Sequence, residues 1–381
     1  MPDSRLEGFL ASERAFRSQS KQQPAMSDTS KIPVCYASVS IGCKDEHTLP
    51  KKLDAIAGAG FQAIELGMPD LLSFANQHLR PDKQRDGKDE IGPYDYDDLC
   101  SAAKLAKAQC DAKDLKILIL QPFANFEGWP EGSSEREDAF TRLKGWIRIM
   151  EAAGTDMLQV GSSDSPEEKI GKDRSRFVKD LQELADMLAE KGFRCAYENW
   201  CWSTHAPDWA DVWDICQKVD RPNFGLCLDT FQSAGGEWGD PTTESGMVED
   251  GRSKEQVESD WKASCKKLSQ TVPADKIFFL QISDAYKPKL PFEKEADESG
   301  MRPRGRWSHD FRPLPFKGYL PVVDFTKTVL DTGFRSWFSY EIFDGGPEGK
   351  GIEYEMPEFA KAAMECQRRL LEACAEKGGE I

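Results

Sequence analysis

The chain has 381 residues and a formal net charge of -16, so it can bury a large core beneath an acidic surface. Such a surface repels phosphate backbones and anionic membranes, which excludes nucleic acid and membranes as expected partners. The eleven cysteines form no CxxC pair, and no apolar run approaches a membrane span or a signal peptide. We therefore expect a cytoplasmic protein with reduced thiols.

Residues 1–31 are polar and rich in Ser, Gln, Lys and Arg. This composition offers little apolar surface to offset the entropy lost on ordering, so we expect a flexible N-terminal arm. Residues 32–381 are expected to form a single domain.

From residue 32 onward, apolar runs typical of strands alternate with segments whose apolar residues recur at three- and four-residue spacing. The predicted strands are Pro33–Val39, Phe61–Leu66, Leu115–Gln121, Asp156–Gly161, Phe193–Glu198, Asn223–Asp229, Lys276–Ile282 and Trp337–Ile342. The predicted helices lie near Leu49–Gly60, Asp95–Lys113, Ser134–Ala153, Asp173–Lys191, Asp208–Val219, Lys254–Thr271, Val322–Thr332 and Glu358–Glu376. Eight strand–helix pairs in strict alternation favour an α/β fold, a closed (β/α)8 TIM barrel.

Two connections are much longer than the others, Gly67–Tyr94 after strand two and Ser283–Tyr319 after strand seven. Connections that follow the strands of a barrel lie at its catalytic mouth. We therefore expect long loops there that form a lid or part of a substrate pocket.

Oxygen-bearing side chains end the last four predicted strands. The four residues are Glu198, Asp229, Gln281 and Glu341. A single carboxylate at a strand tip is more often simply hydrogen-bonded, but four on neighbouring strands are hard to explain by structure alone. Three carboxylates and one amide suit Mg²⁺ or Mn²⁺, with Co²⁺ also possible. The sequence therefore predicts a divalent-metal site at the mouth.

Further candidates lie in the loops around that mouth. His205 follows Glu198 by seven residues and is a candidate acid/base, although an inert loop histidine is an equal alternative. Arg312 and Lys317 lie in the strand-seven loop, where they could hold a substrate carboxylate. Trp202 and Phe126 could form walls around a ring-shaped substrate.

At these residues the chain resembles a known family. The stretch from Tyr197 to Phe231, with its segment VDRPNFGLCLDTF, is similar to the fungal 3-dehydroshikimate dehydratases of the xylose isomerase-like (sugar phosphate isomerase/epimerase) TIM barrels. The likeness includes AIELGMPDL, ILILQPFANFEGW, FFLQISDA and RWSHDFRPLPFKGYLPV, and covers roughly residues 32–345. It implies that Glu198, Asp229, Gln281 and Glu341 are metal ligands, that His205 lies at or beside a catalytic loop position, and that Arg312 lies in the substrate loop.

The chain departs from that family at three positions. The family usually carries His-Tyr where this chain has Asn125-Phe126, and Asn or His where it has Gln232. These three residues are candidate substrate contacts, so the departures bear on the substrate more than on the metal.

The resemblance implies a metal-dependent lyase that converts 3-dehydroshikimate, or a close ring ketone, to protocatechuate, as in quinate and shikimate catabolism. His205, Glu198 and Glu341 would be its catalytic residues, and a homo-oligomer is compatible with the sequence. One alternative is a metal-dependent isomerase or epimerase of sugars or polyols, in which Glu198 and Glu341 move the proton. Another is a metal-free barrel that acts as a binding protein.

Overall fold

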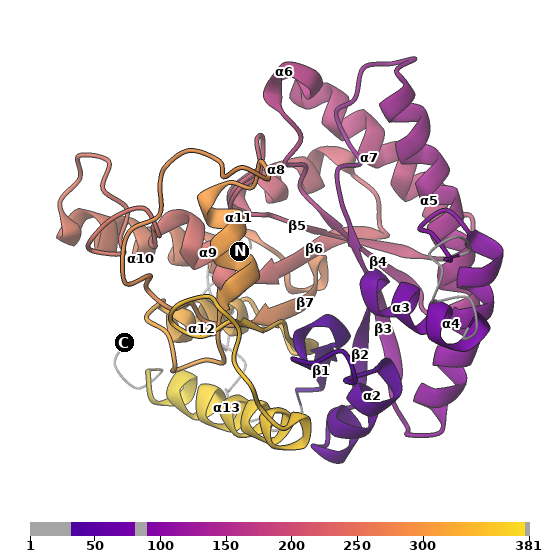
Figure 1. Cartoon of the computed structure of the whole chain (residues 1–381). Coiled ribbons are helices and arrows are strands. Elements are labelled where there is room, and N and C mark those ends of the chain that lie inside the picture. The colour runs from indigo at the N-terminus through magenta and orange to yellow at the C-terminus, as the bar shows by residue number, and fades with distance from the viewer. Residues whose placement is uncertain (1–31, 81–89, 378–381) are drawn as a thin grey trace, which may run out of the picture. The chain divides into compact units, whose positions relative to one another are not determined.

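Eight parallel strands form a closed barrel in the computed structural model, which describes residues 32–80 and 90–377 (Figure 1). The strands are β1 (Val34–Ala37), β2 (Ala63–Gly67), β3 (Lys116–Phe123), β4 (Met157–Gly161), β5 (Arg194–Glu198), β6 (Phe224–Asp229), β7 (Ile277–Ile282) and β9 (Trp337–Tyr340). Each pairs with the next, and β1 pairs with β9 to close the ring. The predicted TIM barrel is confirmed. The predicted arm, residues 1–31, lies outside the described residues.

Helices connect the strands and surround the barrel. They are α2 (Leu49–Gly58), α3 (Met68–Leu79), α4 (Tyr96–Asp111), α5 (Ser134–Ala153), α6 (Glu167–Ile170), α7 (Arg174–Ala189), α8 (Trp209–Val219), α9 (Thr230–Glu237), α10 (Lys254–Thr271), α11 (Pro303–Asp310), α12 (Val322–Asp331) and α13 (Met356–Glu376), with short 3-10 turns η2 (Ser38–Ser40) and η3 (Ala274–Lys276). None of the described helices combines the length and the apolar character that a bilayer span requires.

Local sequence fixes where several of these helices begin. Ser133, Asp208 and Ser253 cap α5, α8 and α10, since each side chain accepts a hydrogen bond from a backbone N–H of the first turn. Asp229 does the same for α9, although it is also the last residue of β6. One carboxylate thus ends a strand and starts a helix, which fixes its position at the mouth.

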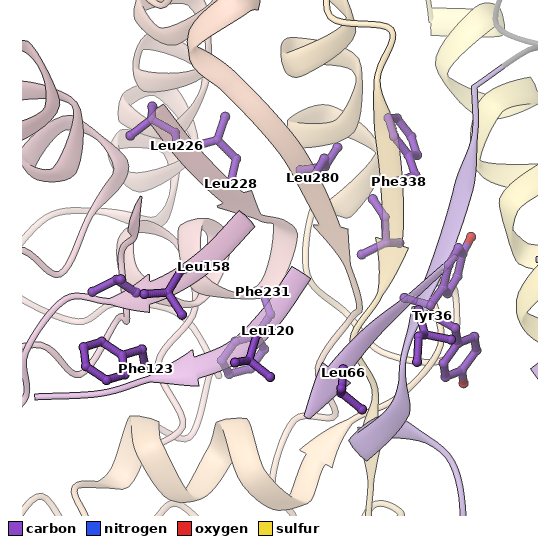
Figure 2. Close-up of a cluster of buried hydrophobic side chains, with 14 of the residues drawn as sticks. Tyr36, Leu66, Leu120, Phe123, Leu158, Leu226, Leu228, Phe231, Leu280 and Phe338 are labelled. Carbon is purple, nitrogen blue, oxygen red and sulfur yellow. The ribbon is translucent and has the colours of Figure 1, made fainter. Parts of the chain in front are cut away.

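The two-residue period of the strands separates two packing layers. Cys35, Leu118, Met157, Cys227 and Phe279 belong to a small apolar layer inside the barrel. The alternate residues face outward and pack against the helices; Leu158, Leu226, Leu280 and Phe338 are examples (Figure 2). Because side chains alternate along a strand, residues two positions beyond the inner layer also point inward, at the mouth.

The two predicted long loops contain regular structure. α3 fills residues 68–79 of the first, since Pro69 at its start and Asp70 in its first turn favour a helix, and Leu71 and Phe74 are buried. Residues 81–89 lie outside the described residues. The second contains α11 and a short strand, β8 (Phe311–Arg312), which pairs with β10 (Phe343–Asp344). The two long connections therefore carry helices and a short strand within them.

The inner layer leads to a test of the barrel core. Phe279 is fully buried, so Phe279→Ala should lower the free energy of unfolding by about 3–5 kcal/mol, because the removed ring leaves a cavity among strands that cannot collapse. Urea denaturation followed by circular dichroism measures the change. Leu290 is 80% exposed, and Leu290→Ala should change stability by less than about 0.5 kcal/mol. Equal losses in the two variants would contradict this description of the core.

Candidate active site

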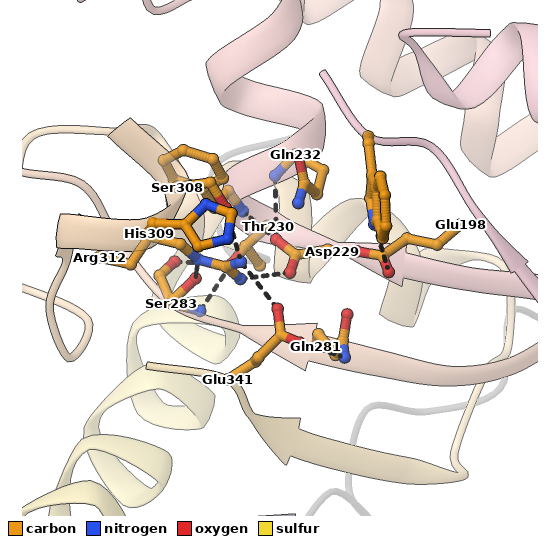
Figure 3. A network of polar contacts seen from close by, with 12 residues as sticks. Glu198, Asp229, Thr230, Gln232, Gln281, Ser283, Ser308, His309, Arg312 and Glu341 are labelled. Carbon is orange, nitrogen blue, oxygen red and sulfur yellow. Dashed lines mark hydrogen bonds and ion pairs between the residues drawn. The ribbon is translucent and has the colours of Figure 1, made fainter. Parts of the chain in front are cut away.

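Three carboxylates meet at the C-terminal mouth of the barrel. Glu198 ends β5, Asp229 ends β6 and Glu341 directly follows β9. One oxygen atom of each lies within 4.8 Å of those of the other two, and all three residues are buried (Figure 3). The prediction that these side chains converge agrees with the geometry. We call Glu198, Asp229 and Glu341 the acidic cluster.

Gln281 adjoins the acidic cluster, as predicted for a residue at the tip of β7. Its Nε2 donates to Oε1 of Glu341 at 3.2 Å and to Oε2 of Glu65 at 3.0 Å. Its Oε1 accepts from the Cys227 thiol at 3.2 Å. The amide therefore links the cluster to the deeper part of the barrel.

Glu65 is a fourth buried carboxylate that the analysis of strand tips missed. It lies on β2, two residues before the strand ends, and accepts hydrogen bonds from Gln281 and Ser339. Burial and the charge of Glu341 raise the pKa of Glu65 to about 8. The two-residue alternation of side chains along β2 could have identified it, since Ala63 belongs to the inner layer and Glu65 follows it by two residues.

Glu198 is held by two donors and keeps one oxygen atom free. Its Oε2 accepts from the amide of Gln159 and, at 3.3 Å, from the indole Nε1 of Trp200. The Trp200 ring packs on Gly161, where a Cβ atom would lie 2.2 Å from the ring, so only glycine fits there. Oε1 of Glu198 is buried and has no hydrogen-bond partner among the described residues. Burial raises the pKa of Glu198 well above its usual range, and the charges of Glu341 and Asp229 add to the effect.

Arg312 supplies the positive charge that contacts the acidic cluster. Its Nη2 lies 2.5 Å from Oδ2 of Asp229 and its Nη1 lies 2.7 Å from Oε2 of Glu341. Nε donates to Oγ of Ser283 at 2.9 Å, and the residue is 1% exposed. Figure 3 shows the guanidinium directed at both carboxylates. The residue predicted to hold a substrate carboxylate thus contacts two predicted metal ligands.

Burial disfavours the ionised form of the carboxylates in the acidic cluster, and the positive charge of Arg312 opposes this effect. Burial raises the pKa of Glu341 to about 7, against the lowering effect of Arg312. Burial also raises the pKa of Asp229, while Arg312 and the backbone N–H groups of Gln232 and Phe231 oppose that rise. Burial thus acts on Glu341 and Asp229 in the same direction, and Arg312 opposes it at both residues.

His205 is buried away from these contacts. Its Nε2 lies 2.8 Å from Oε1 of Glu127, and its ring lies against Phe177 with centroids 4.1 Å apart. Glu127 also accepts from the Tyr197 hydroxyl and from the Ser163 backbone N–H. The structure does not bring His205 into contact with the acidic cluster, and its catalytic role stays a prediction.

Asn125 and Phe126 also serve the packing of the loops. Oδ1 of Asn125 accepts hydrogen bonds from Ser163, Asp164 and Ser165, and the residue has a positive φ of 52°. Phe126 is 1% exposed and contacts the rings of Phe123 and Phe140. That both residues contact the substrate stays a prediction.

The remaining residues predicted to contact the substrate, Gln232, Trp202 and Lys317, differ in how far they are buried. Gln232 is buried in the first turn of α9, and its Oε1 accepts from the backbone N–H of Cys201 at 3.0 Å. Trp202 stacks on Trp200 with ring centroids 5.1 Å apart. Lys317 is exposed, with its ammonium 5.8 Å from the ring centroid of Phe359. Gln232 and Trp202 are thus close to residues of the site, whereas Lys317 lies against α13.

The donor set fits a hard divalent cation. The acidic cluster offers carboxylate oxygens, which Mg²⁺ and Mn²⁺ prefer. The unpaired Oε1 of Glu198 is a buried anionic acceptor that a cation would satisfy. Gln281 currently directs its amide nitrogen at Glu341, and half a turn of that amide would present its oxygen instead. The residues could therefore hold a metal ion.

Comparisons with known proteins agree with the motifs in the sequence. The profile of the xylose isomerase-like TIM barrel family matches residues 53–375. A 3-dehydroshikimate dehydratase of Neurospora crassa is 33% identical over 331 residues, which are 83% of this chain and 88% of that protein. A 3-dehydroshikimate dehydratase of Pseudomonas putida is 28% identical over 299 residues, which are 78% of this chain and 36% of that protein.

A solved structure gives a consistent result. A xylose isomerase-like TIM barrel/4-hydroxyphenylpyruvate dioxygenase fusion protein superposes with a TM-score of 0.65 and 25% identity, over 92% of this chain and 44% of that one. This chain thus spans less than half of the Pseudomonas relative and of the fusion protein, but most of the Neurospora relative. These matches confirm the family resemblance.

The Glu127–His205 pair leads to a pH-dependent prediction. Burial opposes ionisation of Glu127, but His205 and the other donors outweigh it and lower its pKa. A lowered pKa in the folded state stabilises the fold above the ordinary range of a glutamate, and this stability is lost as pH falls through the lowered value. Glu127→Gln should therefore reduce the free energy of unfolding by about 1–3 kcal/mol at pH 7, and by less in acid.

Urea denaturation at a series of pH values measures this difference. Glu183→Gln is the control, because Glu183 pairs with Arg136 but its side chain is 41% exposed. The control should have a much smaller effect at every pH. A loss in Glu127→Gln that does not shrink as pH falls below the ordinary range of a glutamate would show that ionisation of Glu127 is not what stabilises these loops.

Proposed function

This chain belongs to the xylose isomerase-like TIM-barrel family, and on that premise we propose that it is a metal-dependent 3-dehydroshikimate dehydratase. Such a lyase removes water from 3-dehydroshikimate, a cyclic hydroxy-ketone, and yields protocatechuate. The observation that carries the proposal is the acidic cluster with its unpaired Oε1 of Glu198, at the mouth of a barrel whose relatives bear that activity.

The residues that would hold the metal are Glu198, Asp229, Gln281 and Glu341. Their oxygen donors suit Mg²⁺ or Mn²⁺, with Co²⁺ as a substitute. A divalent cation at this position supplies a Lewis acid that polarises the ketone oxygen of the substrate.

The chain's own side chains account for binding and proton transfer. We assign proton transfer in the mouth to Glu341, the carboxylate of the cluster whose pKa burial raises to about 7. His309 lines the pocket described below, and its Nδ1 donates to the carbonyl oxygen of Gly305 at 2.8 Å. Trp200 and Trp202 form an aromatic wall beside Glu198 that excludes water.

A pocket beside the cluster is large enough for a substrate ring. It has a volume of about 510 Å³ and lies among the loops that follow β1 and β9 and the end of α11. Its lining includes Cys43, His309, Phe343, Asp344 and Tyr354. The lining contains no residue of the acidic cluster itself. Phe343 connects the two, because its ring centroid lies 5.5 Å from the guanidinium carbon of Arg312, which contacts Asp229 and Glu341.

His205 takes a different role in this proposal. It is a positioning residue that acts through Glu127, which in turn holds the backbone of Ser163 in the loop after β4. We also propose a cytoplasmic location, since the eleven cysteines are free thiols and most are buried.

Formation of protocatechuate tests the function directly. Protein loaded with Mn²⁺ should convert 3-dehydroshikimate to an aromatic product, followed by ultraviolet absorbance, and chelation should abolish the reaction. Asp229→Asn should reduce kcat/KM by about 100-fold or more, because it removes a charged ligand. The asparagine still caps α9, so the variant should fold.

Asp208→Asn is the matched control for this variant. Asp208 caps α8 in the same way but makes no contact with the acidic cluster among the described residues. It should leave kcat/KM nearly unchanged. A sugar or polyol isomerase would give no aromatic product, and full turnover by protein freed of metal would contradict the metal-dependent mechanism.

A further inference from the structure

We propose that Arg312 competes with the divalent cation for Asp229 and Glu341, so that binding of the cation releases the guanidinium towards the pocket. Arg312 is fully buried and places one nitrogen on each carboxylate, at 2.5 Å and 2.7 Å. It therefore spans the two residues as a bound cation would, rather than forming a fork on one of them.

The oxygen atoms of both carboxylates are already committed. Oδ1 of Asp229 accepts the backbone N–H groups of Phe231 and Gln232, and these cannot move without unwinding the start of α9. Oε1 of Glu341 accepts from Gln281. The oxygens that face Arg312 are Oδ2 of Asp229 and Oε2 of Glu341, so the guanidinium is the partner that a metal ion displaces most readily.

Electrostatics gives the competition its direction. The Arg312 nitrogens lie 2.5 Å from Oδ2 of Asp229 and 2.7 Å from Oε2 of Glu341, so the positive charge acts directly on both ligands. A second, divalent charge on the same oxygens repels the guanidinium across a few ångströms in a buried site. The free Oε1 of Glu198 gives the cation an acceptor that Arg312 does not use.

The surroundings of Arg312 offer a second position. Its guanidinium carbon lies 4.7 Å from the ring centroid of Phe231 and 5.5 Å from that of Phe343. Phe343 lines the pocket, so a guanidinium that leaves the carboxylates can stay on this ring and face the pocket. There it can form a fork with a carboxylate of the substrate. This last step rests on the proposed function, whereas the competition does not.

Titration with Mn²⁺ tests the competition without any substrate. We expect Arg312→Gln to bind Mn²⁺ about tenfold tighter than the unaltered protein, by calorimetry and by paramagnetic resonance of free Mn²⁺. In EDTA the same variant should melt at a lower temperature, because two buried carboxylates lose their partner. Added Mn²⁺ should then raise its melting temperature more than that of the unaltered protein.

Two further variants complete the titration. Arg312→Lys keeps the positive charge but cannot bridge both carboxylates, so this variant should also bind Mn²⁺ more tightly than the unaltered protein, by a smaller factor. It replaces Arg312→Gln in the titration if that variant fails to fold. Arg304→Gln removes a guanidinium of α11 that pairs with Asp240 instead of the acidic cluster, and should leave Mn²⁺ affinity unchanged. Weaker or equal Mn²⁺ binding in both Arg312 variants would overturn the proposal and make Arg312 a support for the ligands.

A second arm uses shikimate, a cyclic hydroxy-acid that lacks the ketone. If the released guanidinium binds carboxylates, shikimate should tighten Mn²⁺ binding by the unaltered protein, and Mn²⁺ should tighten shikimate binding equally. Arg312→Gln should lose this coupling, and coupling that persists in the variant would overturn the second position. The two proposals can also fail separately. If Arg312→Gln binds Mn²⁺ more tightly but the unaltered protein forms no protocatechuate, the competition is supported and the proposed function is rejected.

Discussion

Several carboxylates are buried side by side at one end of the barrel, and the surrounding structure is arranged to tolerate them. Ionised groups lose hydration on burial, and like charges repel one another, so such a set is stable only with compensating donors. Arg312 provides the one guanidinium that contacts Asp229 and Glu341 among the described residues. Gln281 and the raised pKa of Glu65 reduce the remaining charge. A divalent cation would complete this compensation at Glu198.

The fold makes this arrangement possible by separating two tasks along each strand. The inner apolar layer, with Phe279 and Cys227, fills the barrel and stabilises it. The next inward positions carry the polar groups, where strand ends and helix starts supply backbone donors. Asp229 combines both, since its position on β6 is fixed by the sheet and its Oδ1 by the first turn of α9. The residues that stabilise the barrel and the residues that form the site therefore occupy successive inward positions of the same strands.

The sequence predicted what depends on local patterns and missed what depends on the packing of loops. The eight strands and the convergence of Glu198 and Asp229 follow from a two-residue period and from strand ends, both of which are local. Glu65 was not selected from the sequence, because only strand ends were considered and Glu65 lies two residues before the end of β2. The direction of the His205 side chain could not be predicted, since it depends on Glu127 and Phe177, which are distant in sequence and meet it only in the folded chain.

Gln232 shows how a residue beside the cluster can be committed to the backbone rather than to the mouth. It lies three residues after Asp229, in the first turn of α9. Its Oε1 is committed to the backbone of Cys201, and a neutral amide accepts no proton in the physiological range. Under the proposed function, proton transfer at the mouth would then fall to a carboxylate, and Glu341 is the one whose pKa burial raises to about 7. The contact with Cys201 thus gives Gln232 a structural role beside the cluster.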